Sequence, residues 1–70
     1  MNNIASERKR RGMTQGELGV ILGVTGQSVH NWENEKTPIK STSLFEMSKL
    51  FDCSIDYLLG ESDERKRITR

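Results

Sequence analysis

Short stripes of apolar residues at helical spacing, each bounded by a capping residue or a glycine, constrain this chain most. Thr14-Gln15-Gly16-Glu17 has the pattern of a capping box, in which the Thr hydroxyl accepts from the amide three residues on and the Glu reaches back. Gly23 fits the end of the same helix, because glycine adopts the left-handed conformation at little cost. Similar signals recur along the chain, which predicts an all-α fold of five helices.

The remaining helices are placed by the same signals. The first ends at Gly12, the fourth is expected to open at a second capping box over residues 43–46, and Ser54 and Gly60 bound the fifth. Apolar or core-facing positions at helical spacing in the five helices are Ile4, Ala5 and Arg8; Leu18, Ile21 and Leu22; Val29 and Trp32; Leu44, Met47, Leu50 and Phe51; and residues 55–59. The loop 34–40 contains Pro38, and residues 61–70 are expected to form a charged, disordered tail after a domain over 1–60.

Length and composition exclude several classes of protein. Seventy residues make one small domain with no room for a deep cleft. A single Cys53 cannot form an intramolecular disulfide, which favours a reducing compartment, and no segment predicts a membrane span or a secretory signal. One His and one Cys predict neither a catalytic dyad nor a metal site, so we expect no enzyme, no cofactor and no small-molecule substrate. The chain is expected to be cytoplasmic.

Charge is divided unevenly along the chain. Residues 1–11 carry four basic side chains against Glu7, whereas residues 12–60 carry six acidic side chains against three lysines. The pI of about 7.9 lies below the value above about 9 that is common among dedicated nucleic-acid binders. Overall charge therefore neither indicates nor excludes a DNA partner.

The segment over residues 14–34 predicts a helix-turn-helix. The turn at Gly23-Val24-Thr25 is tight, and Thr25 can cap the helix that follows. Gly19 is small where the two helices must lie close together. Side chains expected to bury the joint are Leu18, Leu22, Val24, Val29 and Trp32. This arrangement is typical of proteins that place their second helix in the major groove of DNA.

Amide side chains line the face that the helix after Thr25, the second helix of the helix-turn-helix, is expected to present to solvent. Gln27, Asn31 and Asn34 follow at i, i+4 and i+7, and Ser28 and His30 flank them. Asn or Gln can form a bidentate pair with adenine that discriminates by about 1–3 kcal/mol. A solvated polar surface is the alternative interpretation, but the amide row coincides with the tight turn. The pattern therefore favours reading of base edges.

These residues resemble the Cro/C1-type (phage repressor-like, XRE) helix-turn-helix family. The resemblance rests on Thr14-Gln15-x-Glu17-Leu18, on Gly23-Val24-Thr25, Val29 and Trp32-Glu33, and on the ending SIDYLLG at residues 54–60. It covers about residues 4–60. It implies a five-helix, lambda-repressor-like domain that binds double-stranded operator DNA as a transcriptional regulator, acting as a repressor and often as a dimer on a palindrome.

The resemblance also implies roles for individual residues. Gln15 would contact a phosphate, and Asn34, Lys36 and Lys40 would contact the DNA backbone. Residues that would face bases or neighbouring phosphates are Thr25, Gln27, Ser28 and Asn31, and His30 could pair with a phosphate. Gly26 stands where relatives often carry a long polar side chain, so either that base contact is missing or the backbone approaches DNA more closely.

Two further expectations concern contacts between protein groups. Arg8 lies one turn after Ile4 on the apolar face, and Glu33 leans toward the core side of its helix, so the two are expected to form a structural ion pair. The alternative is that Arg8 belongs to the solvated basic run over residues 8–11. Candidate dimer contacts are Ile55, Tyr57, Leu58 and Leu59, more apolar residues than one short helix easily buries. The alternative function is a protein-interaction module, such as the antitoxin of a toxin–antitoxin pair.

Overall fold

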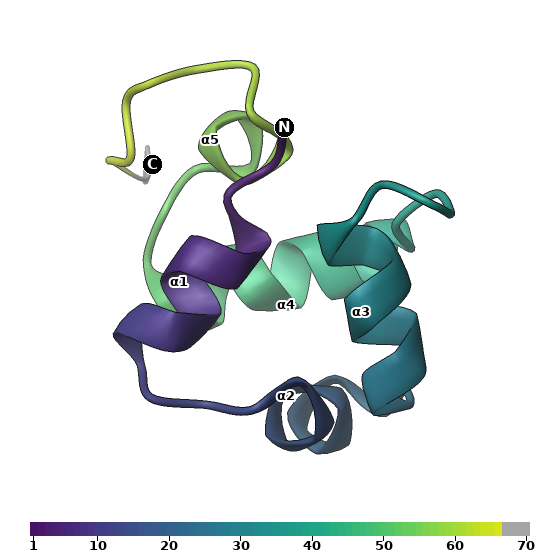
Figure 1. Ribbon diagram of the computed structural model, residues 1–70. Coiled ribbons are helices and arrows are strands. Elements are labelled where there is room, and N and C mark those ends of the chain that lie inside the picture. Colours follow the sequence, from purple (N-terminus) through teal and green to yellow (C-terminus); the bar gives the residue numbers. More distant parts are fainter. Residues whose placement is uncertain (67–70) are drawn as a thin grey trace.

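Helices account for all the regular structure within residues 1–66, the part of the chain that the computed structural model describes. Their bounds are α1 (Ile4–Arg10), α2 (Gln15–Leu22), α3 (Gly26–Glu33), α4 (Ser41–Phe51) and α5 (Ile55–Leu59). Figure 1 shows α2 and α3 meeting at a tight turn, with α1 above α2, α4 behind, and α5 beside the N-terminus. The predicted all-α architecture is confirmed.

Side-chain caps begin α2, α3 and α5 as the sequence predicts. Thr14 Oγ1 accepts from the backbone N–H of Glu17 at 3.0 Å, and Glu17 Oε1 accepts in return from the N–H of Thr14 at 2.8 Å. Thr25 and Ser54 each accept from the amide three residues on, both at 3.1 Å. Gly23 has φ +71°, and so ends α2 in the left-handed conformation.

The capping box expected at residues 43–46 is wrong. The N-cap of α4 is Lys40, three residues before the expected cap Ser43, and it makes no side-chain cap; the helix begins at Ser41. Ser43 therefore lies within the first turn of the helix, where its side chain is buried. The N–H of Leu44 donates to the carbonyl of Lys40 at 3.0 Å, which makes the first turn continuous through Ser43.

One apolar core joins all five helices. Its fully buried members are Ile4, Leu18, Val29, Met47, Phe51, Cys53 and Leu58, and Trp32 is nearly so. Burial raises the pKa of the Cys53 thiol to about 11, so this thiol is a small apolar core group and not a reactive one. Ile21, expected in the α2 stripe, is instead 51% exposed, because Leu18 and Leu22 already fill the side of α2 that faces the core.

Gly19 lets the turn between α2 and α3 press against α2. A Cβ at this position would lie 2.7 Å from the carbonyl oxygen of Val24 and 2.9 Å from the carbonyl carbon of Thr25. Backbone atoms cannot move aside as a flexible side chain can. The close approach of the turn therefore requires glycine at Gly19.

Replacing Gly19 by alanine is expected to destabilise the domain by about 1–3 kcal/mol, because the new methyl group overpacks this contact. Gly16→Ala is the matched control in the same helix, since a Cβ there meets only Thr14 Oγ1, at 3.9 Å. That control is expected to stabilise by about 0.5–1 kcal/mol through helix propensity. Urea unfolding compares the two variants, and equal effects would contradict the account.

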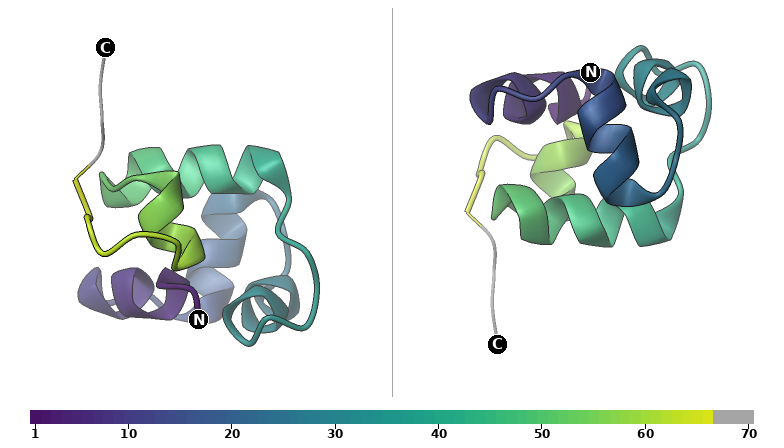
Figure 2. Two further views of the ribbon diagram at one scale, coloured as in Figure 1. Left: turned by 90° about the horizontal axis from the view of Figure 1, so that it is seen from above. Right: turned by 90° about the horizontal axis from the view of Figure 1, so that it is seen from below.

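The segment after α5 turns back toward the end of α4 (Figure 2). Arg65 donates to both carboxylate oxygens of Glu7, at 3.0 and 2.8 Å, and to the carbonyl of Phe51 at 2.8 Å. Tyr57 Oη donates to the same carboxylate at 3.1 Å, and the N–H of Ser54 donates to the carbonyl of Arg65 at 3.0 Å. Residues 61–66 thus make contacts that the expectation of a disordered tail did not foresee; residues 67–70 of that tail lie outside the described part.

Glu7 is buried, with 1% of its surface exposed. Its shortest ion pair is with Arg65, at 2.8 Å, whereas Arg10 lies 3.7 Å away. Hydrogen bonds from Arg65 outweigh the effect of burial, and with Tyr57 they hold the pKa of Glu7 below its ordinary value of 4.5. A lowered pKa means that the pair stabilises the fold fully above pH 4.5. This contribution is lost as the pH falls through the pKa of the folded state.

Arg65→Gln is therefore expected to lower the free energy of unfolding by about 1–3 kcal/mol at pH 7, because it leaves a buried carboxylate short of donors. The difference from the wild type should shrink as the pH falls below the ordinary value for Glu7. Lys66→Gln, on the exposed neighbouring residue, should change little at any pH. Thermal unfolding across pH 3–7 tests this; a difference that persists unchanged at pH 3 would argue against the pair.

Candidate nucleic-acid interface

The helix-turn-helix holds α3 rigidly against α2. A Cβ on Gly26 would lie 3.1 Å from both the Cα and the N of Gly16, so Gly26 faces the backbone of α2. Val29 and Trp32, further along α3, point into the core. The structure thus gives a packing reason for Gly26, and it places this residue at the joint between the two helices.

Gln27 and Asn31 lie together on the outer side of α3. Gln27 Nε2 donates to Asn31 Oδ1 at 3.1 Å, one helical turn along. Gln27 is exposed and Asn31 is half-buried. Because each amide carries two donors and an acceptor oxygen, this single bond leaves the pair with further donors and acceptors for a ligand. The two side chains are thereby held side by side on this face of α3.

The other expected contact residues surround this pair. Thr25 and Ser28 lie at the start of α3, their hydroxyl oxygens 3.1 Å apart. At the other end, Asn34 Nδ2 donates to the carbonyl of His30 at 2.8 Å. Lys36 and Lys40 are exposed in the segment that follows, between α3 and α4. All ten residues expected to contact DNA thus lie at the start of α2, on α3 or its N-cap, or in the segment between α3 and α4.

A buried polar network fixes α1, α2 and α3 to one another. Arg8 Nε donates to Glu33 Oε2 at 2.6 Å, and Arg8 Nη2 to Glu33 Oε1 at 3.2 Å. Arg8 Nη1 donates to the carbonyl of Met13 at 2.7 Å, and Gln15 Nε2 donates to Glu33 Oε1 at 3.0 Å. The expected partners Arg8 and Glu33 therefore do lie in contact, and both side chains are about nine-tenths buried or more.

The environment of Glu33 favours its charged form. Burial acts most strongly and would raise the pKa of Glu33. The hydrogen bonds from Arg8 and Gln15, with the positive charge of Arg8, together outweigh burial and leave the pKa below 4.5. Glu33 is therefore an ionised anchor near neutral pH, and it links the end of α3 to the first residue of α2.

Several polar contacts were missed by the sequence analysis. Asn2 Nδ2 donates to the carbonyl of Trp32 at 2.8 Å, and Asn3 Nδ2 donates to that of Tyr57 at 2.7 Å, so the N-terminal residues bridge α3 and α5. Glu7 is the third buried group of α1. Its spacing of three residues from Ile4 placed it on the core-facing side and could have indicated its burial.

The candidate dimer surface on α5 is smaller than expected. Leu58 is completely buried in the core, so its inclusion was wrong; the short helix needs one leucine to anchor it to α4. Tyr57 is half-buried, with its hydroxyl bound to Glu7. Ile55 is also half-buried, and Leu59 is 37% exposed.

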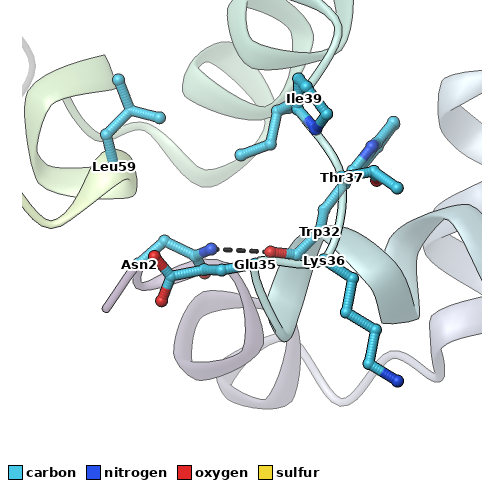
Figure 3. Close-up of a pocket in the computed structure, with 8 residues that line it drawn as sticks. Asn2, Trp32, Glu35, Lys36, Thr37, Ile39 and Leu59 are labelled. Carbon is cyan, nitrogen blue, oxygen red and sulfur yellow. Dashed lines mark hydrogen bonds between the residues drawn. The ribbon is translucent and has the colours of Figure 1, made fainter.

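A shallow hollow of about 370 Å³ lies between the N-terminal residues, the loop after α3 and α5. Figure 3 shows Ile39 and Leu59 bordering it and Lys36 extending away from it. Both polar and apolar residues line this hollow, and neither Gln27 nor Asn31 is among them.

In the described part of the chain, no three His, Cys, Asp or Glu residues are grouped as metal ligands would be. Every helix in that part is too short or too polar to cross a bilayer.

Comparisons with known proteins match this architecture. A family model described as helix-turn-helix matches residues 4–58. Repressor protein C2 of Salmonella phage P22 is 36% identical over 56 residues, which make up 80% of this chain and 26% of that protein. The HTH-type transcriptional regulator ImmR of Bacillus subtilis (strain 168) is 30% identical over 60 residues, or 86% of this chain and 47% of that protein. The chain thus spans about a quarter and about half of the length of these curated relatives.

A solved structure is similar as well. The crystal structure of the P22 c2 repressor in complex with a synthetic operator has a TM-score of 0.77 to this chain at 33% identity. The likeness covers 86% of this chain and 91% of the other.

Proposed function

Because this chain belongs to the helix-turn-helix family, we propose that it binds double-stranded DNA sequence-specifically and regulates transcription as a repressor, with α3 in the major groove. The observation that carries the proposal is the outward pair Gln27–Asn31, held on a helix that α2 and the core fix in place. Two curated relatives are a repressor and a transcriptional regulator, and the similar solved structure is a complex with operator DNA.

Contacts to DNA divide into two kinds in this proposal. Gln27 and Asn31 read base edges, while Thr25 and Ser28 meet bases or adjacent phosphates at the start of α3. The remaining contacts position the protein on the DNA backbone: Gln15 at the positive end of α2, His30 and Asn34 on α3 and its cap, and Lys36 and Lys40 in the loop. Gly26 contributes by close packing of α3 on α2.

The chain would act in the cytoplasm of a bacterial or phage-infected cell, without a cofactor or a small-molecule substrate. A homodimer on a palindrome would use Leu59 and Ile55 of α5, since Leu58 is withdrawn into the core. Sedimentation of the free protein and of its DNA complex tests this arrangement: a single copy on DNA would remove the dimer.

Selection of bound duplexes from a random pool near physiological salt tests the function. Enrichment of a site with half-sites about one DNA turn apart supports a dimeric, sequence-specific regulator. A pool that never enriches, with only weak and salt-sensitive binding, would overturn the proposal. It would leave a protein-interaction module, such as an antitoxin, as the alternative.

A further inference from the structure

The basic side chains of α1 lie on different sides of the helix. Arg8 is buried and donates to the carboxylate of Glu33 on α3. Arg10 lies 3.7 Å from the carboxylate of Glu7, which is bound to α5 through a tyrosine hydroxyl. Because successive residues of a helix are turned by about 100°, Lys9 lies on the other flank of Arg8 from Glu7. Lys9 is therefore the cation of α1 on the flank away from α5.

This flank of α1 belongs to the side of the domain that carries the proposed DNA-binding face. Figure 2 shows α1, the start of α2 and α3 along one side of the domain, with α4 along the opposite side. Glu33 joins these three elements, because Arg8 and Gln15 both donate to its carboxylate. Burial raises the pKa of Glu33, the two donors lower it, and the positive charge of Lys9 adds to that lowering. The Lys9 ammonium thus lies within electrostatic range of the carboxylate that Gln15 contacts.

The charge of Lys9 is left available by the contacts of the domain. Within residues 1–66, no carboxylate forms an ion pair with Lys9, whereas Arg8 and Arg10 each have one. The two carboxylate oxygens of Glu33 are already bound by Arg8 and Gln15. Lys9 is also exposed. An ammonium group on a flexible four-carbon stem can pair with a phosphate without a fixed geometry.

We propose that Lys9 contacts a DNA phosphate next to the one that Gln15 meets, and so extends the contact with the DNA backbone from α2 to α1. The inference rests on the proposed function and adds one backbone contact to it. Arg10 has no such role, because it lies on the flank of α1 toward α5. Arg11 comes after α1 and lies toward Cys53, where its positive charge opposes the effect of burial on the pKa of the thiol.

The salt dependence of DNA affinity tests this contact. For Lys9→Gln, the slope of log affinity against log salt should become shallower by about 0.9, the amount for one phosphate contact on duplex DNA. Between about 50 and about 200 mM salt, the wild type should therefore lose about 3.5 times more affinity than the variant. Selected and unrelated duplexes should be affected alike, because a phosphate contact carries no base preference.

Arg10→Gln is the matched control, since it removes the same charge from the same helix. It should keep the wild-type slope and bind within about twofold of the wild type, because salt screens a charge that lies more than about 10 Å from the phosphates. Both side chains are exposed, so both variants should unfold at the temperature of the wild type. An equal effect of the two substitutions on affinity and slope would overturn the inference.

Replacing phosphates one at a time locates the contact. In a duplex recovered from the pool, a neutral methylphosphonate removes one negative charge at a chosen position. At one position, next to the one at which Gln15→Ala loses its effect, the wild type and Lys9→Gln should bind equally well. An effect of Lys9→Gln that persists at every substituted position would overturn the inference. If Gln27→Ala still relaxes base preference in that case, the proposed function stands; failure to enrich any duplex would count against the function itself.

Discussion

Replacing both Gln27 and Asn31 by alanine is expected to weaken binding to the selected DNA site by about 100-fold or more. Each amide that pairs with a base contributes about 1–3 kcal/mol of discrimination, and the two side chains also orient one another through their 3.1 Å hydrogen bond. Binding to unrelated DNA should change little, because phosphate contacts supply most of that affinity. Titration of both duplexes at one salt concentration measures the two effects.

The control for this result is the free energy of unfolding of the double variant. Gln27 is exposed and the pair bonds mainly to itself, so the double variant should unfold within about 0.5 kcal/mol of the wild type. Lys36→Gln is expected to behave differently, lowering affinity for the selected and the unrelated duplex by similar factors. If the double alanine variant lost both kinds of binding equally, the amides would not be reading bases.

Arg8→Met is expected to destabilise the domain by about 3–5 kcal/mol, since it leaves the carboxylate of Glu33 buried without its charged partner. Small domains have total stabilities of about 5–15 kcal/mol, so much of the variant could be unfolded at 37 °C. Arg10→Met is the matched control on the same helix. Its side chain is 61% exposed, and its carboxylate contact is long, at 3.7 Å. Urea unfolding of both variants measures the difference.

A second variant separates the ion pair from simple packing. Arg8→Met combined with Glu33→Met removes both charges and keeps much of the apolar volume, so it should recover part of the stability lost by Arg8→Met alone. A single variant that loses less than about 1 kcal/mol would show that the pair lies in contact without stabilising the fold.

Local hydrogen bonding explains which parts of the fold were predictable from the sequence. Thr14, Thr25 and Ser54 cap helices through amides three residues away, and Gly23 needs a left-handed backbone, so these helix ends depend on neighbours in the chain. The pattern Ser-x-x-Glu at residue 43 failed because the same spacing also occurs inside a helix. What distinguishes the two cases is burial of Ser43 against the core, a tertiary effect.

Contacts between residues far apart in the sequence were predictable only where each residue carried its own signal. Arg8 and Glu33 could be paired because each occupies a core-facing position that a charge cannot hold alone. Arg65 had no such signal, since its partner Glu7 lies 58 residues away and the segment between α5 and Arg65 has no periodic pattern. Leu58 and Leu59 are neighbours on a helix of five residues, too short for periodicity to tell which one is buried.

Selection from the random pool, repeated with Asn31→Ala, tests most directly whether α3 reads bases. The account predicts that the variant enriches the wild-type site with one position of each half-site made degenerate, while the spacing between half-sites stays the same. Gln27→Ala should relax a different position. Identical base preferences at every position in the wild type and in both variants would contradict the assignment of α3 as the reading helix.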